Sequence, residues 1–302
     1  MAVAEPYVPD PLGPARRFFR SPQSGPRLSG SLRSSLRDTN RAAWYAGGLF
    51  TALTVLAVAG PALAPHSPLV PAGAAFTPPG HGGFLLGSDS IGRDELSRVL
   101  YGIRTSWFSA LGVIASGVLI GGLVGLLAGA AGGWLDEVLM RLTDAFLALP
   151  GPVLAIAVVA ALGPSLLHTL VAVGIVWWPF YARIVRGEVR SLAARPHLEA
   201  ARLSGASRWS LMTRHLLPGA APAIVVTASL DVGNLILTLA GLSFLGLGSP
   251  APAPELGAMA ARNLSYLLQS WWVPIMPAIA IFMLAFLSNM TGDFLRDALR
   301  DT

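Results

Sequence analysis

Long apolar stretches dominate this sequence of 302 residues and constrain its fold more than any motif does. A helix needs about 20 mostly apolar residues to cross the hydrocarbon core of a bilayer. Six stretches meet that requirement: 44–64, 105–131, 142–162, 166–185, 220–245 and 271–291. Only 12% of the residues are charged, about half the share found in soluble domains. The chain is therefore predicted to be an all-α, polytopic membrane protein with six transmembrane helices.

Prolines and short connections add detail to these spans. Pro150 and Pro152 lie in the third span, and Pro274 and Pro277 lie in the sixth. Prolines in packed membrane helices are tolerated and usually mark kinks. Only residues 163–165 separate the third span from the fourth, so these two spans are predicted to form a tight hairpin.

The arginine distribution predicts the orientation of the spans. With the N-terminus in the cytoplasm, the inside segments hold seventeen arginines and the outside segments hold four. Basic residues concentrate in cytoplasmic loops, so both termini are predicted to be cytoplasmic. The protein is expected in the cell (inner) membrane.

The first span is predicted to be an uncleaved anchor. The small residues Ala62 and Ala64 resemble a signal cleavage site, but the preceding basic region extends to Arg41 and Pro65 follows the site. Residues 1–43 are rich in Pro, Ser, Gly and Arg, a composition that does not bury enough apolar surface to fold alone. This tail is expected to be disordered and held near anionic lipid headgroups.

Two residue types are missing from the chain, and their absence excludes several chemistries. Without cysteine, no disulfide or thiolate metal site forms. All 21 basic residues are arginines, so the lysine that a phosphate-binding Walker A loop requires is absent. No nucleophile–base pair or cofactor motif is found, and the chain is predicted to be non-catalytic and without a cofactor. The high pI of about 10.4 reflects the cytoplasmic arginines rather than nucleic-acid binding.

Glycines repeat every four residues along the second span, at Gly117, Gly121, Gly125 and Gly129. This spacing places them in a stripe on one helix face, where a neighbouring backbone can approach closely. The partner helix lies either in this chain or in another subunit.

A polar segment of about 35 residues separates the fourth and fifth spans. Pro196 is suited to the first turn of a helix, and the charge of Glu199 complements the helix dipole there. Gly205 is positioned to end that helix in a left-handed cap. Ala200 and Ala201 give the helix a flat face, which suits it to a groove on a partner protein. The alternative is an amphipathic helix lying on the lipid headgroups.

The spacing of this segment resembles the EAA motif of ABC importer permeases. Glu199, Ala200 and Ala201 are followed by Ser204 and Gly205, and then by Leu217 and Pro218. From residue 86 onward the chain is similar to the C-type permease subunits of dipeptide/oligopeptide (peptide/nickel) importers. Further segments that carry the resemblance are 87–89, 92–94, 96–98, 132–134, Asp144, 149–150, 178–183, 186–189, 214–215, 243–248, 292–293 and 295–297.

The resemblance implies the ABC type I importer permease fold and a machine of several subunits. Its expected partners are a homologous sister permease, two ATP-binding cassette subunits or domains, and an extracytoplasmic substrate-binding protein. The motif residues named above would couple the chain to the ATPases. The expected organisation is a tail (1–43), a first span with an extracytoplasmic segment (44–104), the permease core (105–293) and a cytoplasmic C-terminal tail (294–302).

Asp231 lies about halfway along the fifth span, and a carboxylate at such a depth normally faces a cavity or a partner. It is a candidate for the transport pathway together with Asn234; the alternative is a structural acid that pairs with Asn234. Asp144 and Arg141 are three residues apart and are expected to form a local ion pair. His66 and His81 are isolated from other ligands, so no metal site is predicted.

The favoured function is ATP-driven import of di- or oligopeptides. Nickel or another small solute such as haem remains an alternative substrate. An ion-coupled secondary transporter, the alternative from a different class, would be expected to show paired intramembrane acids and inverted repeats. A purely structural membrane protein would leave the spacing from Glu199 to Pro218 without an explanation.

Overall fold

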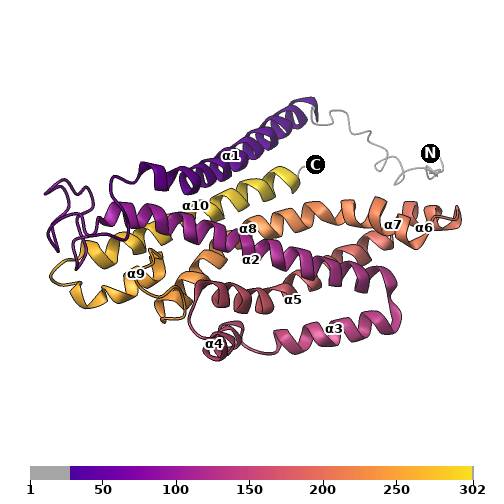
Figure 1. Ribbon diagram of the computed structural model, residues 1–302. Coiled ribbons are helices and arrows are strands. Elements are labelled where there is room, and N and C mark those ends of the chain that lie inside the picture. Colours follow the sequence, from indigo (N-terminus) through magenta and orange to yellow (C-terminus); the bar gives the residue numbers. More distant parts are fainter. Residues whose placement is uncertain (1–27, 301–302) are drawn as a thin grey trace, which may run out of the picture.

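The computed structural model of the protein describes residues 28–300, and its long elements are all helices (Figure 1). The helices are α1 (Leu28–Leu63), α2 (Glu95–Ala131), α3 (Gly133–Leu147), α4 (Gly151–Leu162), α5 (Leu166–Ala193), α6 (Pro196–Leu203), α7 (Arg208–Leu211), α8 (Leu217–Phe244), α9 (Leu256–Arg262) and α10 (Trp272–Arg300). A π-helical turn, Met212–Leu216, precedes α8, and a 3₁₀ turn, Leu264–Tyr266, follows α9. Within the described residues, five helices are long and apolar enough to cross a membrane, or up to six if α3 and α4 form one span.

Five of the predicted spans correspond to the long helices α1, α2, α5, α8 and α10. Several of these helices extend well beyond the apolar core predicted for them. The α1 helix begins at Leu28 rather than at residue 44, because the prolines of the tail end at Pro26 and no further proline interrupts the helix before Pro61. Residues 1–27 of the tail that was expected to be disordered lie outside the described residues.

The third predicted span, 142–162, is not a continuous helix. The α3 helix ends at Leu147, and α4 begins at Gly151 after a bend of 82°. Pro150 lacks the N–H group that would continue the α3 hydrogen-bond ladder, and it disfavours a helical conformation in Leu149 before it. At this proline the structure has a full break in place of the expected kink. The connection from α4 to α5 is short, as the sequence predicts, but Figure 1 shows α4 end-on and α5 along its length, so the two helices cross steeply instead of forming an antiparallel hairpin. Ser165 caps α5 by accepting a hydrogen bond from the backbone N–H of His168 (3.1 Å).

The glycine stripe of α2 packs against α5 of the same chain. A Cβ atom added at Gly121 would lie 2.2 Å from the backbone oxygen of Trp178, and one added at Gly125 would lie 2.4 Å from that of Ala182. Cβ atoms added at Gly117 and Gly129 would also meet α5, on either side of these two contacts. Only glycine allows two helix backbones to approach so closely, so the partner left open by the sequence is α5.

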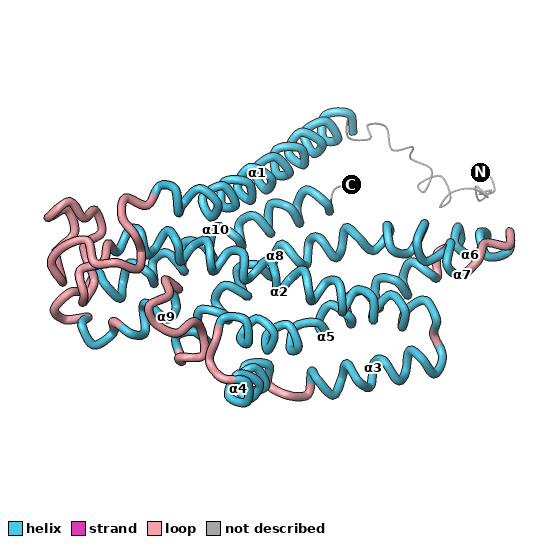
Figure 2. The backbone as a smooth tube through the Cα atoms, viewed as in Figure 1, coloured by secondary structure: helices cyan, strands magenta, loops and turns pink. Residues whose placement is uncertain are grey.

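The two ends of the helical bundle differ in structure. Figures 1 and 2 show α6 and α7 at one end, and α9 with the long loop that follows α1 at the other. The loop is held to the bundle by the buried guanidinium group of Arg98, which donates to the carbonyls of Pro68 (2.7 Å) and Pro252 (3.4 Å). The indole N–H of Trp272 also donates to the carbonyl of Ser88 (3.2 Å).

Candidate functional site

The polar segment between the fourth and fifth spans forms α6, a short helix at the end of the bundle opposite α9 (Figure 1). Pro196 occupies its first turn, and Glu199 lies in the same turn, as the sequence predicts. Proline is favoured there because the first N–H groups of a helix have no intrahelical acceptor.

The C-terminus of α6 is closed by a Schellman motif centred on Gly205. Gly205 has a φ of +84°, which confirms the predicted left-handed cap. Its N–H donates to the carbonyl of Arg202 (3.0 Å), and the N–H of Ala206 donates to that of Ala201 (3.1 Å). These two bonds satisfy carbonyls that the helix end leaves unpaired. The turn therefore fixes how the chain leaves α6.

One face of α6 is anchored through Leu198 and the half-buried Ala201, while the other face is open to solvent. Leu198 is buried (2% exposed) in an apolar cluster beneath the helix. Glu199 and Ala200 are exposed, and Leu203 is 86% exposed. An exposed large apolar side chain beside a carboxylate and small residues makes this face suitable for contact with another protein.

The cluster beneath α6 joins it to three long helices. It consists of Leu126, Val185, Val189, Leu192, Leu198, Leu211, Leu216 and Ala220. These residues come from α2, α5, α6, α7, the π-helical turn and α8. Because buried apolar side chains are close-packed, a displacement of α6 acts on all of these elements.

The motif proline, Pro218, is associated with a local change of helix geometry. Proline has no N–H group for the carbonyl of Arg214, four residues earlier, and its ring crowds that carbonyl. The chain adopts a π-helical turn over Met212–Leu216, and Leu217 donates its N–H to the carbonyl of Met212. Such turns inside α-helices are frequent at functional sites.

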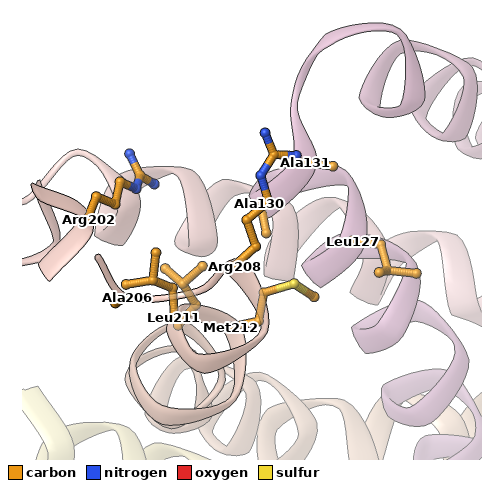
Figure 3. Close-up of a pocket in the computed structure, with 9 residues that line it drawn as sticks. Leu127, Ala130, Ala131, Arg202, Ala206, Arg208, Leu211 and Met212 are labelled. Carbon is orange, nitrogen blue, oxygen red and sulfur yellow. The ribbon is translucent and has the colours of Figure 1, made fainter. Parts of the chain in front are cut away.

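A pocket of about 430 Å³ lies between α6, α7 and the end of α2. It is lined by Leu127, Ala130, Ala131, Arg202, Ala206, Arg208, Leu211, Met212 and Leu216. In Figure 3 the guanidinium groups of Arg202 and Arg208 are directed to the same side of this pocket. The end of the molecule that carries α6 thus presents apolar and positively charged groups together.

Asp231 is buried between α5 and α8 and is surrounded by donors. Its Oδ2 atom accepts from the indole N–H of Trp177 and from the hydroxyl of Tyr181 (3.2 Å), and its Oδ1 atom accepts from the amide of Asn234 (3.3 Å). The pairing with Asn234 is the one considered from the sequence. Trp177 and Tyr181 were not anticipated, because they lie about 50 residues earlier in the chain.

The local ion pair expected between Arg141 and Asp144 is wrong. Arg141 instead pairs with Glu137 one turn earlier (2.7 Å), and Asp144 pairs with Arg183 of α5 (2.5 Å). The α5 helix lies beside α3 and supplies a cation that the sequence alone did not place there.

The histidines of the loop after α1 have separate environments. The Nδ1 atom of His66 lies 3.6 Å from a carboxylate oxygen of Asp94, whereas that of His81 lies 3.1 Å from the carbonyl of Pro79. Within residues 28–300, no three His, Asp or Glu side chains are grouped closely enough to hold a metal ion.

Comparison with solved structures supports the fold. An inward-facing structure of the MetNI methionine ABC transporter contains a chain that is 21% identical to this one, with a TM-score of 0.56. The match covers 68% of this chain and 96% of that one. The shared fold thus spans about two thirds of this chain.

Comparison with known sequences assigns the family. The chain is 40% identical over 248 residues to the probable D,D-dipeptide transport system permease protein DdpC of Escherichia coli (strain K12), covering 82% of this chain and 83% of that protein. It is 45% identical over 214 residues to the glutathione transport system permease protein GsiD of Pectobacterium atrosepticum, covering 71% of each. Residues 121–301 match the family described as the binding-protein-dependent transport system inner membrane component. The chain therefore belongs to this family of membrane-embedded permease subunits.

Proposed function

We propose that this chain forms half of a translocation pathway for di- or oligopeptides, and that α6 couples it to ATPase subunits. Family membership makes it a component of a binding-protein-dependent ABC transporter in the inner membrane. The peptide substrate is supported by the relatives named for a D,D-dipeptide and for glutathione, and by a di/tripeptide permease of Pseudomonas aeruginosa that is 41% identical over 229 residues. Nickel and haem remain alternative substrates for the same machine.

The observation that carries the coupling role is the geometry of α6. The helix is exposed at one end of the bundle, ends at a rigid glycine turn and is anchored through Leu198 to the long helices. The proposed docking residues are Glu199, Ala200, Ala201, Ser204 and Gly205, with Leu217 and Pro218 shaping the return into α8. Movement of this helix by the ATPases would bias the permease between inward- and outward-facing states.

Two glycines at opposite ends of the molecule allow a matched test. Gly205 and Gly246 have φ values of +84° and +85°, and neither has an atom within 4 Å of an added Cβ. Leucine at either site imposes a similar backbone strain of roughly 1–2 kcal/mol. In proteoliposomes that contain the complete transporter, Gly205→Leu and Glu199→Arg are expected to lower the substrate imported per ATP hydrolysed, whereas Gly246→Leu leaves this ratio unchanged.

The outcome that would refute the docking role is equally specific. If Gly205→Leu and Glu199→Arg import as much substrate per ATP as the unmodified transporter does, α6 does not couple it to the ATPases. If Gly246→Leu lowers the ratio as much as Gly205→Leu does, backbone strain explains the loss and docking does not.

The proposed orientation places α6 and both termini in the cytoplasm. Its support is the arginine bias of the sequence together with the separation of α6 from α9. Because the chain has no cysteine, single cysteines at Ser204 and Leu268 can report the orientation; Leu268 is 99% exposed at the α9 end. A membrane-impermeant maleimide applied to spheroplasts should label Leu268→Cys and leave Ser204→Cys unlabelled. The reverse pattern would invert the topology.

The remaining partners follow from the proposed machine: a sister permease, two ATP-binding cassette units and an extracytoplasmic binding protein. Asp231 and Asn234 are the candidate pathway residues. We favour a positioning role for Asp231, because its carboxylate already accepts three hydrogen bonds. Asn234 is exposed on the same helix and can still contact a passing solute.

A further inference from the structure

We propose that Asp136 is a positioning residue that ties α3 to α5, so that α3 moves together with the coupling helix α6. This inference rests on the proposed coupling role of α6. It assigns a mechanical role to a cluster of charges that lies outside the coupling motif.

The cluster is centred on a buried carboxylate. Asp136 lies in the first turn of α3 and is 4% exposed, whereas the side chain of its neighbour Glu137 is 63% exposed. A buried carboxylate is costly unless cations and hydrogen-bond donors surround it. The fold must therefore supply such groups to Asp136.

Two arginines of α5 supply them. Arg186 approaches the carboxylate with a forked pair of donors, Nε to Oδ1 and Nη2 to Oδ2 (2.8 Å). Arg190, one turn further along α5, donates from Nη2 to the same Oδ2 atom (2.5 Å). Bidentate pairing with a carboxylate fixes direction as well as distance, so Asp136 fixes the position of α3 along α5.

The backbone around Arg186 is also held from the side of α2. A Cβ atom added at Gly125 would lie 2.9 Å from the backbone nitrogen of Arg186, and one added at Gly129 would lie 3.1 Å from its backbone oxygen. The α2 helix leads directly into α3 through Gly132. The α2–α3 unit thus contacts α5 at Arg186 through close backbone packing and through charge.

The cluster lies on the route from α6 to the broken span. The α5 helix ends at Ala193, three residues after Arg190, and α6 begins at Pro196. At its other end α3 leads through the 82° bend into α4. A displacement of α6 that pulls on the end of α5 is therefore transmitted through Asp136 to α3, and from α3 to the bend.

Removing the charge should release α3. With asparagine at position 136, Arg186 and Arg190 lie one turn apart without the carboxylate that they share, and like charges at this spacing repel. A second ion pair between the helices, Asp144 with Arg183, is more exposed: both of its side chains are 58% exposed. Phe146 of α3 also makes an edge-to-face contact with Trp178 of α5 (5.5 Å between ring centroids), which holds the far end of α3 but supplies no charge. Exposed pairs contribute little, so this second pair does not replace the first.

The test compares neighbouring isosteric changes in the complete reconstituted transporter. Asp136→Asn is expected to reduce substrate import per ATP hydrolysed by at least about fivefold, the low end of typical allosteric coupling, while ATP hydrolysis continues. Glu137→Gln should leave the ratio unchanged, and Asp136→Glu should restore most of it. An unchanged ratio in Asp136→Asn would overturn the proposal.

A second measurement does not depend on whether Asp136→Asn assembles. Val138 of α3 and Ser191 of α5 are both exposed, and the chain has no native cysteine. Spin labels on Val138→Cys and Ser191→Cys in an otherwise unmodified transporter should keep the same separation in the nucleotide-free and ATP-bound states. A separation that changes with nucleotide would show that α3 and α5 move independently, and would overturn the proposal.

The two proposals fail in distinguishable ways. If Gly205→Leu uncouples transport and Asp136→Asn does not, α6 still couples to the ATPases and only the role of Asp136 is wrong. If Gly205→Leu also leaves the ratio unchanged, the coupling role itself is wrong.

Discussion

The packing of α2 against α5 leads to a quantitative prediction at Gly121. A Cβ atom at this position would lie 2.2 Å from the backbone oxygen of Trp178, 2.8 Å from the Cβ atom of Tyr181 and 2.9 Å from the backbone nitrogen of Ala182. These atoms belong to, or adjoin, a helix backbone and have no rotamer that moves them aside. Gly121→Ala therefore forces the two helices apart.

The size of the effect follows from these distances. Ordinary van der Waals contact begins at 3.4 Å, so the helices must separate by roughly the difference of 1.2 Å. Inserting a methyl group into a packed interface of this kind costs about 1–3 kcal/mol. Gly122 is the matched control, since a Cβ atom there meets nothing within 4 Å. Alanine should stabilise the helix at Gly122 by up to about 1 kcal/mol.

The two alanine variants should therefore differ in stability by about 1–4 kcal/mol. The assay is thermal unfolding of the purified protein in detergent. The measured quantity is the fraction of protein that stays monodisperse after heating to each temperature. Gly121→Ala should unfold at a clearly lower temperature than Gly122→Ala. Equal unfolding temperatures would refute the close approach of α2 and α5 at this glycine.

Two further predictions concern buried polar groups. Asp231→Ala leaves the donors of Trp177 and Tyr181 without an acceptor and is expected to lower stability by about 1–3 kcal/mol. Asp231→Asn retains an acceptor and should keep both stability and transport. Loss of transport in a stable Asp231→Asn protein would instead indicate a pathway role. Arg98→Ala removes the hydrogen bond to Pro68 that helps to hold the loop after α1, at a cost of about 1.5–3 kcal/mol, while the bond from Trp272 to Ser88 remains. The variant should make that loop more sensitive to proteolysis, whereas alanine at the exposed Arg104 should not. Equal protection in both variants would contradict the anchoring role.

The long helices were predictable because their signal is local in sequence. A run of about 20 apolar residues is sufficient to predict a span, and Pro196 and Gly205 indicate the ends of α6 through their own backbone restrictions. The position of Pro150 indicated a kink. Whether that kink becomes a full break depends on what packs beside α3 and α4, which the local sequence does not contain.

The contacts between distant residues were not predictable from one sequence. The glycine stripe indicated a close helix partner without identifying it, because any helix with an open backbone face satisfies the pattern. Asp136 and Arg186 are 50 residues apart and meet only because α3 returns beside α5. The same arrangement pairs Asp144 with Arg183 instead of Arg141. In each case the partner is set by which helices lie side by side in the folded bundle.

Native mass spectrometry would show whether this chain works as the permease of an ATP-driven importer that is coupled through α6. The complex would be purified through a tag on this chain, from cells expressing either the unmodified protein or Gly205→Leu. We expect a sister permease and two ATP-binding cassette units with the unmodified chain, together with a released peptide, and a smaller fraction of complexes that retain both ATPase units with Gly205→Leu. A homo-oligomer of the unmodified chain without any ATPase would contradict the account.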